Sequence, residues 1–161
     1  MRFLVIGGLA VIEHGYSRFT ADIDLLIDRT DEEKWCEFLV RLGYQVASKG
    51  ESFLQFLPNA PSHWPVDLML VAPETFAGLV ADASPVSLKG AQVSLVSINH
   101  LIALKLHVLK QAQLHRFLKD FQDIIELVRI NHLDLHSEAM RGLFLRYGDA
   151  DLYEKIKRAI E

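Results

Sequence analysis

The sequence predicts an α/β (α+β) protein in which a mixed β-sheet carries flanking helices and is followed by a helical C-terminal part. In residues 1–96, short apolar runs of strand length alternate with segments of helical periodicity. In residues 97–161, only helical periodicity is found. The 161 residues suffice for one domain with its own core, so we expect the two parts to form a single compact unit.

The N-terminal part is expected to supply all the strands. Apolar runs rich in β-branched and aromatic residues predict strands over 2–6, 23–28, 44–48, 52–57, 65–72 and a hairpin over 86–95. The hairpin turn falls at Lys89 and Gly90. Helical patterns between these runs predict helices over 8–14, 31–42 and 73–82, the second of them capped by Thr30 or Asp31.

The C-terminal part reads as helices throughout. Apolar residues recur at helical spacing over 98–113, 116–130, 137–147 and 150–160. The sequence has no repeat, no low-complexity tract and no linker rich in Pro, Gly or Ser between the two parts.

Composition narrows the class of protein. Half of the residues are hydrophobic, which excludes a disordered chain. A single cysteine, Cys36, rules out an internal disulfide and fits a reducing compartment, so we expect a cytoplasmic location. No apolar run reaches the length of a membrane span, so no membrane partner is expected. The opening MRFLVIGGLAVI is not read as a signal peptide, because no clear small-residue cleavage site follows.

A glycine pair stands where the first strand turns into the first helix. Gly7 and Gly8 follow the apolar run at residues 3–6 and precede a short helical segment. Glycine lets a ligand approach the backbone closely, and the first N–H groups of a helix are open to phosphate oxygens. An ordinary tight turn also uses such a pair, so the glycines alone do not establish a phosphate site.

Two carboxylates begin the strand at 23–28. Asp22 and Asp24 are two residues apart, which puts them on one face of an extended chain, while Ile23, Leu25 and Ile27 point to the other face. Like charges this close repel unless a cation or a proton lies between them, and Mg²⁺ is commonly held by one or two carboxylates plus substrate phosphates. Two solvated aspartates at a strand end are the alternative.

A third carboxylate, Asp67, interrupts the apolar strand at 65–72. A carboxylate in a buried strand is costly unless it is paired or binds a metal. If this strand lies beside the strand at 23–28, Asp67 joins Asp22 and Asp24, and three carboxylates can hold two metal ions. A structural ion pair explains Asp67 equally well.

These motifs resemble the nucleotidyltransferase superfamily that includes DNA polymerase beta. The matching residues are Gly7 and Gly8, then Arg18-x-Thr20-x-Asp22-x-Asp24, then Val66-Asp67-Leu68. Within this superfamily, the segment at 7–27, GGLAVIEHGYSRFTADIDLLI, is most similar in pattern to the opening of the AbiEii/MenA-type toxins of toxin–antitoxin systems. A second segment is similar to the same group: 101–105, ending in Lys105, and Arg116-x-x-Lys119-Asp120-x-x-Asp123. The resemblance covers roughly residues 3–130.

The resemblance implies a catalytic core at 1–96 and a helical part at 97–161 packed on it. It implies that Asp22, Asp24 and Asp67 are catalytic and bind Mg²⁺, in a two-metal site. It also implies that a nucleoside triphosphate is the substrate. The expected nucleotide-binding residues are Gly7, Gly8, Arg18, Thr20 and Lys105.

Lys105 has a separate physical argument. It falls inside an apolar helical stripe formed by Ile98, Leu101, Ile102, Leu109 and Ala112. A lysine there needs an anionic partner, which a nucleotide phosphate or an aspartate such as Asp120 could provide. On the next helix, Lys119 and Asp123 are spaced for an i,i+4 ion pair, as are Arg116 and Asp120, and the roles of Lys119, Asp120 and Asp123 stay open.

The sequence therefore predicts an enzyme that moves a nucleoside monophosphate from a triphosphate to an acceptor. The acceptor is left open among an RNA 3′ end such as that of transfer RNA, a protein hydroxyl and a small molecule. As a toxin, the protein would have an antitoxin as partner. The alternative interpretation is an inert nucleotide-binding or partner-binding module that kept the fold.

Overall fold

The computed structural model describes residues 1–110 and 114–161. Within them the chain forms two compact units. One consists of Met1–Ala10 and Arg18–Ser97 and contains the sheet, and the other consists of Val11–Ser17 and Ile98–Glu161 and contains helices. The end of the helix expected at 98–113, including Ala112, lies outside the described residues.

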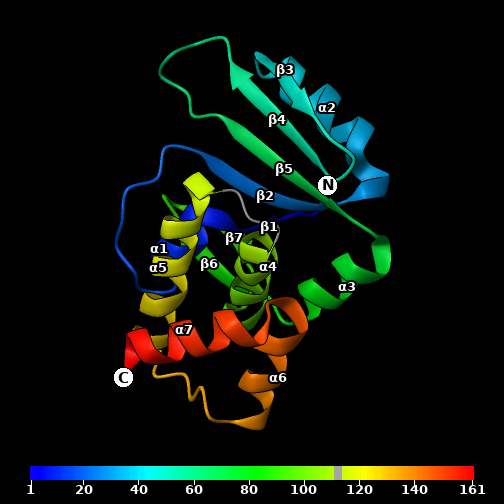
Figure 1. Ribbon diagram of the computed structural model, residues 1–161. Helices are drawn as coiled ribbons and strands as arrows, with labels where there is room; N and C mark the ends of the chain where they lie inside the picture. Colours follow the sequence, from blue (N-terminus) through cyan, green and yellow to red (C-terminus); the bar gives the residue numbers. More distant parts are fainter. Residues whose placement is uncertain (111–113) are drawn as a thin grey trace. The chain divides into compact units, whose positions relative to one another are not determined.

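The sheet unit is built on seven strands in the order β3-β4-β5-β2-β1-β7-β6 (Figure 1). The strands are β1 (Leu4–Val5), β2 (Ile23–Asp28), β3 (Tyr44–Lys49), β4 (Phe53–Pro58), β5 (Val66–Val71), β6 (Ser84–Leu88) and β7 (Ala91–Leu95). Two pairs are parallel, β2 with β5 and β1 with β7, and the other neighbours are antiparallel. The predicted mixed sheet is confirmed, with strand ends within a few residues of the expected ones.

Strands β4 and β5 alternate between a buried and a more open face. In β4, Leu54 and Phe56 are fully buried, whereas Phe53 and Leu57 are 48% and 40% exposed. Side chains two residues apart share a face of a strand, so this alternation follows directly from the sequence. The open face of β4 continues onto β5, where Asp67 is only partly buried.

Helices α2 (Glu32–Arg41) and α3 (Pro73–Ala81) belong to the sheet unit, and α1 (Gly7–Glu13) starts there. A 3₁₀ turn at Arg29–Asp31 precedes α2, and Asp28 caps it by accepting a hydrogen bond of 2.9 Å from the N–H of Thr30. This bond is the main reason why the pKa of Asp28 is lowered. Of the two expected caps of α2, Asp31 is the N-cap residue, but its side chain makes no capping hydrogen bond.

The hairpin of β6 and β7 turns at Lys89 and Gly90, as predicted. Both residues have positive φ, +48° and +86°, which is the backbone of the tight turns that join twisted antiparallel strands. Glycine adopts this conformation without steric cost, so Gly90 fixes the position of the turn.

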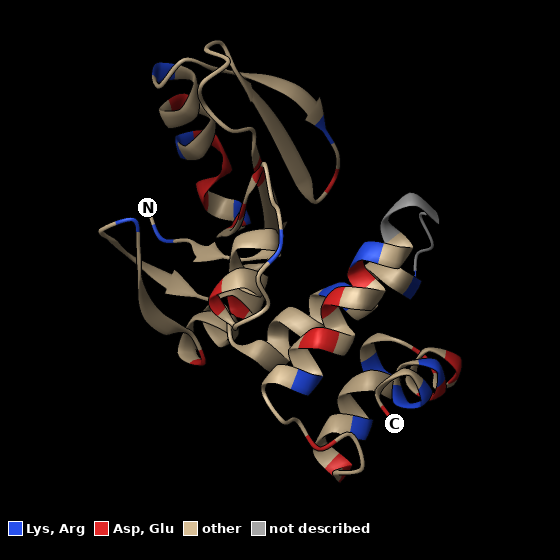
Figure 2. Ribbon diagram, turned by 90° about the vertical axis from the view of Figure 1, so that its left-hand side faces the viewer, with Lys and Arg blue, Asp and Glu red and all other residues tan. Residues whose placement is uncertain are grey.

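The helical unit consists of the 11–17 segment and four helices: α4 (Ile98–Lys110), α5 (Leu114–Ile130), α6 (Glu138–Tyr147) and α7 (Ala150–Ile160). Its core is formed by apolar side chains that are fully buried, among them Leu106, Ile124, Phe144 and Ile156. Basic and acidic residues are interspersed on its helices (Figure 2). None of the helices in residues 1–110 and 114–161 combines the length and the apolar character needed to cross a membrane.

We predict that Asp149→Ala destabilises the protein by about 1 kcal/mol. Asp149 is the N-cap of α7, where its Oδ1 accepts a hydrogen bond of 2.8 Å from the N–H of Leu152. Asp151→Ala is the matched control, because its ion pair with Lys155 is exposed and such pairs contribute little. Urea unfolding of both variants checks this, and equal losses of stability would contradict the capping role.

Candidate metal and nucleotide site

Three carboxylates come together where β2 and β5 run side by side. Asp22 immediately precedes β2, Asp24 lies in it, and the parallel register places Asp24 directly opposite Asp67. One carboxylate oxygen from each residue lies within 4.8 Å of the other two, and the described parts of the chain contain no second group of this kind. The expectation that the strand of Asp67 lies beside that of Asp22 and Asp24 is confirmed.

Neighbouring groups orient two of these carboxylates. The Thr20 hydroxyl donates a hydrogen bond of 2.6 Å to Oδ1 of Asp22, and Thr20 is buried. The backbone N–H of Gly8 donates to Oδ2 of Asp24 at 3.3 Å. These donors leave room for further ligation, since a carboxylate can accept about four hydrogen bonds or ligands.

The glycine pair makes space for the site's own side chains. A Cβ on Gly7 would lie 1.9 Å from Oδ2 of Asp24, and one on Gly8 would lie 2.2 Å from the Thr20 hydroxyl oxygen. Gly7 also has φ +59°, which side-chain-bearing residues rarely adopt. The sequence predicted that these glycines admit phosphate; the structure shows that Asp24 and Thr20 fill the space beside their α-carbons. Contact with a triphosphate through their backbone stays a prediction.

Arg18 lies close to the same turn. Its Nη1 donates a hydrogen bond of 2.9 Å to the carbonyl oxygen of Phe19 and would be 3.3 Å from a Cβ at Gly8. A guanidinium therefore stands near the backbone that supports Asp24. The predicted nucleotide contacts of Arg18 and Thr20 are not tested by these positions and stay predictions.

The electrostatics of the three carboxylates suit a divalent cation. At an effective dielectric constant of about 20, two unit charges 4.8 Å apart repel by roughly 3–4 kcal/mol. Grouping three such oxygens is therefore stable only if protons, donors or cations offset the repulsion. Carboxylate oxygens are the ligands that Mg²⁺ prefers, so the residues present fit this ion.

Lys105 lies in the helical unit and has two aspartates as partners. Its Nζ is 2.7 Å from Oδ1 of Asp120 and 2.6 Å from Oδ2 of Asp123. Of the two predicted kinds of partner, phosphate and aspartate, the structure shows the aspartate. The second partner was missed: Asp123 was paired with Lys119 on spacing alone. Asp123 is three residues after Asp120, and this spacing puts both carboxylates on one helix face. That relation could have identified Asp123 as a second partner of Lys105.

This cluster is nearly inaccessible to solvent, since the side chains of Lys105 and Asp123 are 8% and 1% exposed. The pairing predicted between Arg116 and Asp120 falls outside the described residues, because the side chain of Arg116 is not described. A nucleotide contact of Lys105 stays a prediction.

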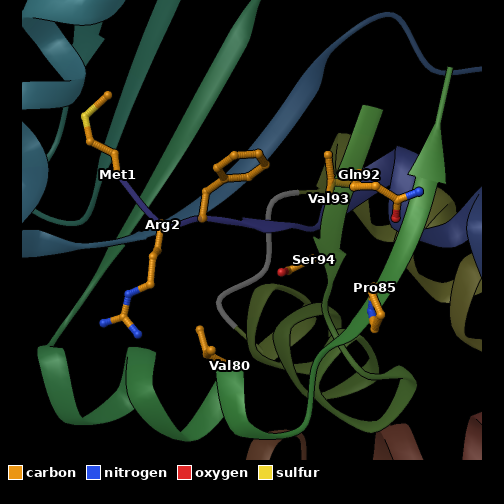
Figure 3. A pocket seen from close by; sticks show the side chains of 8 residues that line it. Met1, Arg2, Val80, Pro85, Gln92, Val93 and Ser94 are labelled. Atoms are coloured by element: carbon orange, nitrogen blue, oxygen red, sulfur yellow. The ribbon is translucent and has the colours of Figure 1, made fainter. Parts of the chain in front are cut away.

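One hollow of the sheet unit is separate from the carboxylates. It has a volume of about 300 Å³ and lies among the N-terminal residues, the end of α3 and the β6–β7 hairpin (Figure 3). Its lining includes Arg2, Val80, Gln92 and Ser94 but no aspartate or glutamate. It therefore offers no carboxylate to a divalent cation and is not part of the candidate site.

Comparisons with known proteins place the chain by its fold. No family model matches the sequence, and no curated protein matches it. Several solved structures are similar to the chain in fold. The antibiotic-resistance factor ANT(2″)-Ia superimposes with a TM-score of 0.65 at 15% identity, over 98% of this chain and 86% of that one. An antigenic nucleotidyltransferase-like protein from Paracoccidioides brasiliensis gives 0.55 at 18% identity, over 96% and 84%.

A third similar structure is the lincosamide antibiotic adenylyltransferase LnuA with lincomycin bound. It gives a TM-score of 0.57 at 16% identity, over 80% of this chain and 86% of that chain. At these low identities, the superpositions show a shared fold. The chain therefore has the mixed α/β fold of nucleotidyltransferases, as the sequence motifs implied.

We predict that Gly7→Ala and Gly8→Ala each destabilise the protein by on the order of 1–3 kcal/mol, because the new methyl group overlaps Asp24 or Thr20. Gly78→Ala in α3 is the control: a Cβ there meets nothing within 4 Å, and alanine favours a helix by roughly 0.5–1 kcal/mol. Denaturant unfolding compares the three variants. Equal stability in all three would show that the glycines are not needed for space.

We predict that Lys105→Met destabilises the ligand-free protein by about 3–5 kcal/mol, because it leaves two aspartates without their shared cation. Lys110→Met, exposed at the end of the same helix, should change stability by less than about 0.5 kcal/mol. Thermal melts with and without MgATP check both roles. An unchanged melting temperature of ligand-free Lys105→Met would contradict the structural role of Lys105. If the variant loses only the rise in melting temperature that MgATP causes, the nucleotide contact is supported.

Proposed function

We propose that the protein is a metal-dependent nucleotidyltransferase that moves a nucleoside monophosphate from a triphosphate to an acceptor hydroxyl. The observation that carries the proposal is the convergence of Asp22, Asp24 and Asp67 within 4.8 Å on two parallel strands of this fold. The comparison structures with the same fold include adenylyltransferases, which supports this class of reaction.

In the proposed reaction, the acceptor oxygen forms a bond to the α-phosphorus of the triphosphate. The bond from that phosphorus to the oxygen of the leaving group breaks, and pyrophosphate departs. Asp22 and Asp24 would hold the magnesium that accompanies the triphosphate, and Asp67 would complete the site for a second ion. Asp67 also helps to activate the acceptor hydroxyl, whose proton passes to this carboxylate or to solvent. When bound, magnesium would neutralise charge on the phosphates and make the acceptor hydroxyl more acidic.

The proposed nucleotide-binding residues are Gly7, Gly8, Arg18, Thr20 and Lys105. The position of the Arg18 guanidinium beside Gly8 supports the first part of this set, because arginine binds phosphate through several donors at once. Thr20 also orients the candidate metal ligand Asp22, because its hydroxyl donates a hydrogen bond to that carboxylate.

Two kinds of similarity bear on the acceptor. ANT(2″)-Ia has been solved in complex with adenylyl-2″-tobramycin, and LnuA is a lincosamide antibiotic adenylyltransferase. These structures support a small-molecule acceptor. The motif resemblance to AbiEii/MenA-type toxins supports an RNA or protein acceptor and an antitoxin partner, and the single cysteine supports a cytoplasmic location. We keep all three acceptor classes in the proposal.

Label transfer tests the proposal. The protein is incubated with Mg²⁺, cell extract and each of the four α-labelled ribonucleoside triphosphates, and pyrophosphate is measured alongside. We expect label to enter an acceptor with release of pyrophosphate, and both to stop on addition of EDTA. If none of the triphosphates yields labelled product or pyrophosphate, the protein is an inert module with this fold.

We predict that Asp22→Asn and Asp24→Asn each abolish transfer and magnesium-dependent nucleotide binding while the fold survives, since like-charge repulsion is also relieved.

Asp67→Asn should keep near-normal triphosphate affinity and lose turnover by orders of magnitude, because Asp22 and Asp24 still hold the nucleotide's metal. Asp28→Asn, at the end of the same strand, is the control, because asparagine also caps helical turns. Full activity of Asp24→Asn would refute the metal assignment, and unfolding of Asp67→Asn would favour a structural ion pair.

A further inference from the structure

The polar surface of the site continues across the sheet beyond Asp67. Antiparallel pairing of β4 with β5 places Gln55 directly opposite Asp67, and pairing of β3 with β4 places Ser48 opposite Gln55. Opposed residues of neighbouring antiparallel strands have Cβ atoms about 4.5–5.5 Å apart on one face. Gln55 is therefore the next side chain on this face after Asp67, on the side away from Asp24.

Gln55 is the one polar side chain of β4, whose sequence is FLQFLP. Phe53 and Leu57 lie two residues to either side and share its face, and they are 48% and 40% exposed. Leu54 and Phe56 point the other way into the core. On the face that Asp67 shares, β4 therefore presents the apolar Phe53, the amide of Gln55 and the apolar Leu57 in a row. We call these three residues the β4 strip.

The β4 strip and its neighbours on β3 carry no charge. Gln45 is paired opposite Leu57 and Ser48 opposite Gln55, so the adjoining positions on this face are neutral as well. A polyanion such as RNA is held chiefly by Lys and Arg contacts to phosphate, which the β4 strip does not offer. A neutral ligand with an apolar portion is what this surface complements.

We infer that the β4 strip binds the acceptor, and that the acceptor is a neutral, hydroxyl-bearing small molecule with an apolar portion. The inference rests on the proposed function and narrows its acceptor to one class. The reacting hydroxyl lies at Asp67, the Gln55 amide hydrogen-bonds the adjacent polar group of the acceptor, and Phe53 and Leu57 contact its apolar part. Gln55 is thus a specificity-determining residue.

Binding is tested without triphosphate, so the result does not depend on transfer. The amide NMR spectrum of the ¹⁵N-labelled full chain is recorded with n-octyl-β-D-glucoside below its micelle concentration, with glucose, and with a single-stranded RNA oligonucleotide. We expect octyl glucoside to shift the amides of residues 53–57 and glucose to shift them much less. Gln55→Ala should weaken octyl glucoside binding by roughly three- to tenfold, the effect of one lost hydrogen bond. Gln92→Ala, on β7, should bind like the wild type.

Three results would overturn the inference: no octyl glucoside shifts at residues 53–57, shifts there with RNA instead, or wild-type affinity in Gln55→Ala. Retention of the remaining amide shifts by Gln55→Ala shows that the variant is folded. If octyl glucoside binds as expected but no triphosphate is turned over, the surface is confirmed as a binding site and the proposed reaction is refuted.

Discussion

The close approach of three carboxylates is the constraint on which the sheet unit depends. The parallel register of β2 and β5 sets Asp24 opposite Asp67, and Asp22 follows from the period of the strand. Each neighbouring feature accommodates this arrangement: glycine at positions 7 and 8 leaves space for Asp24 and Thr20, and the Gly8 N–H and the Thr20 hydroxyl donate to the carboxylates. Such costly grouping of like charge is typical of functional sites.

The two units differ in the partners of their grouped acidic residues. In the helical unit, Asp120 and Asp123 share the ammonium group of Lys105 within 2.7 Å, so their charge is met by a side chain of the same unit. In the sheet unit, Asp22 and Asp24 accept hydrogen bonds from a neutral hydroxyl and a neutral backbone N–H, and they lie beside a third carboxylate. The first arrangement stabilises a fold; the second is suited to binding an ion.

Much of the fold could be predicted from the sequence, because the periods of strands and helices are local properties. The strand at 23–28 has the predicted bounds and the hairpin turns at Lys89 and Gly90 as predicted, since apolar alternation and turn chemistry are visible in the chain. The two-residue spacing of Asp22 and Asp24 and the position of Asp67 inside an apolar strand are also local features, so the sequence could identify the three aspartates as candidate metal ligands. Strand order and register depend on tertiary packing, so the neighbourhood of Gln55 and Asp67 could not be read from spacing. Asp123 was assigned to Lys119 because helical spacing shows only the neighbours on one helix, whereas its partner Lys105 lies on another.

Manganese binding measured by electron paramagnetic resonance is a direct test of whether the three carboxylates form a metal site, because Mn²⁺ takes the same oxygen ligands as Mg²⁺. We expect the wild-type protein to bind Mn²⁺ and MgATP to compete with it. Asp24→Asn should lower the affinity at least tenfold while Asp28→Asn leaves it unchanged. Equal Mn²⁺ affinity in the wild-type and Asp24→Asn proteins would show that the three carboxylates do not form a metal site.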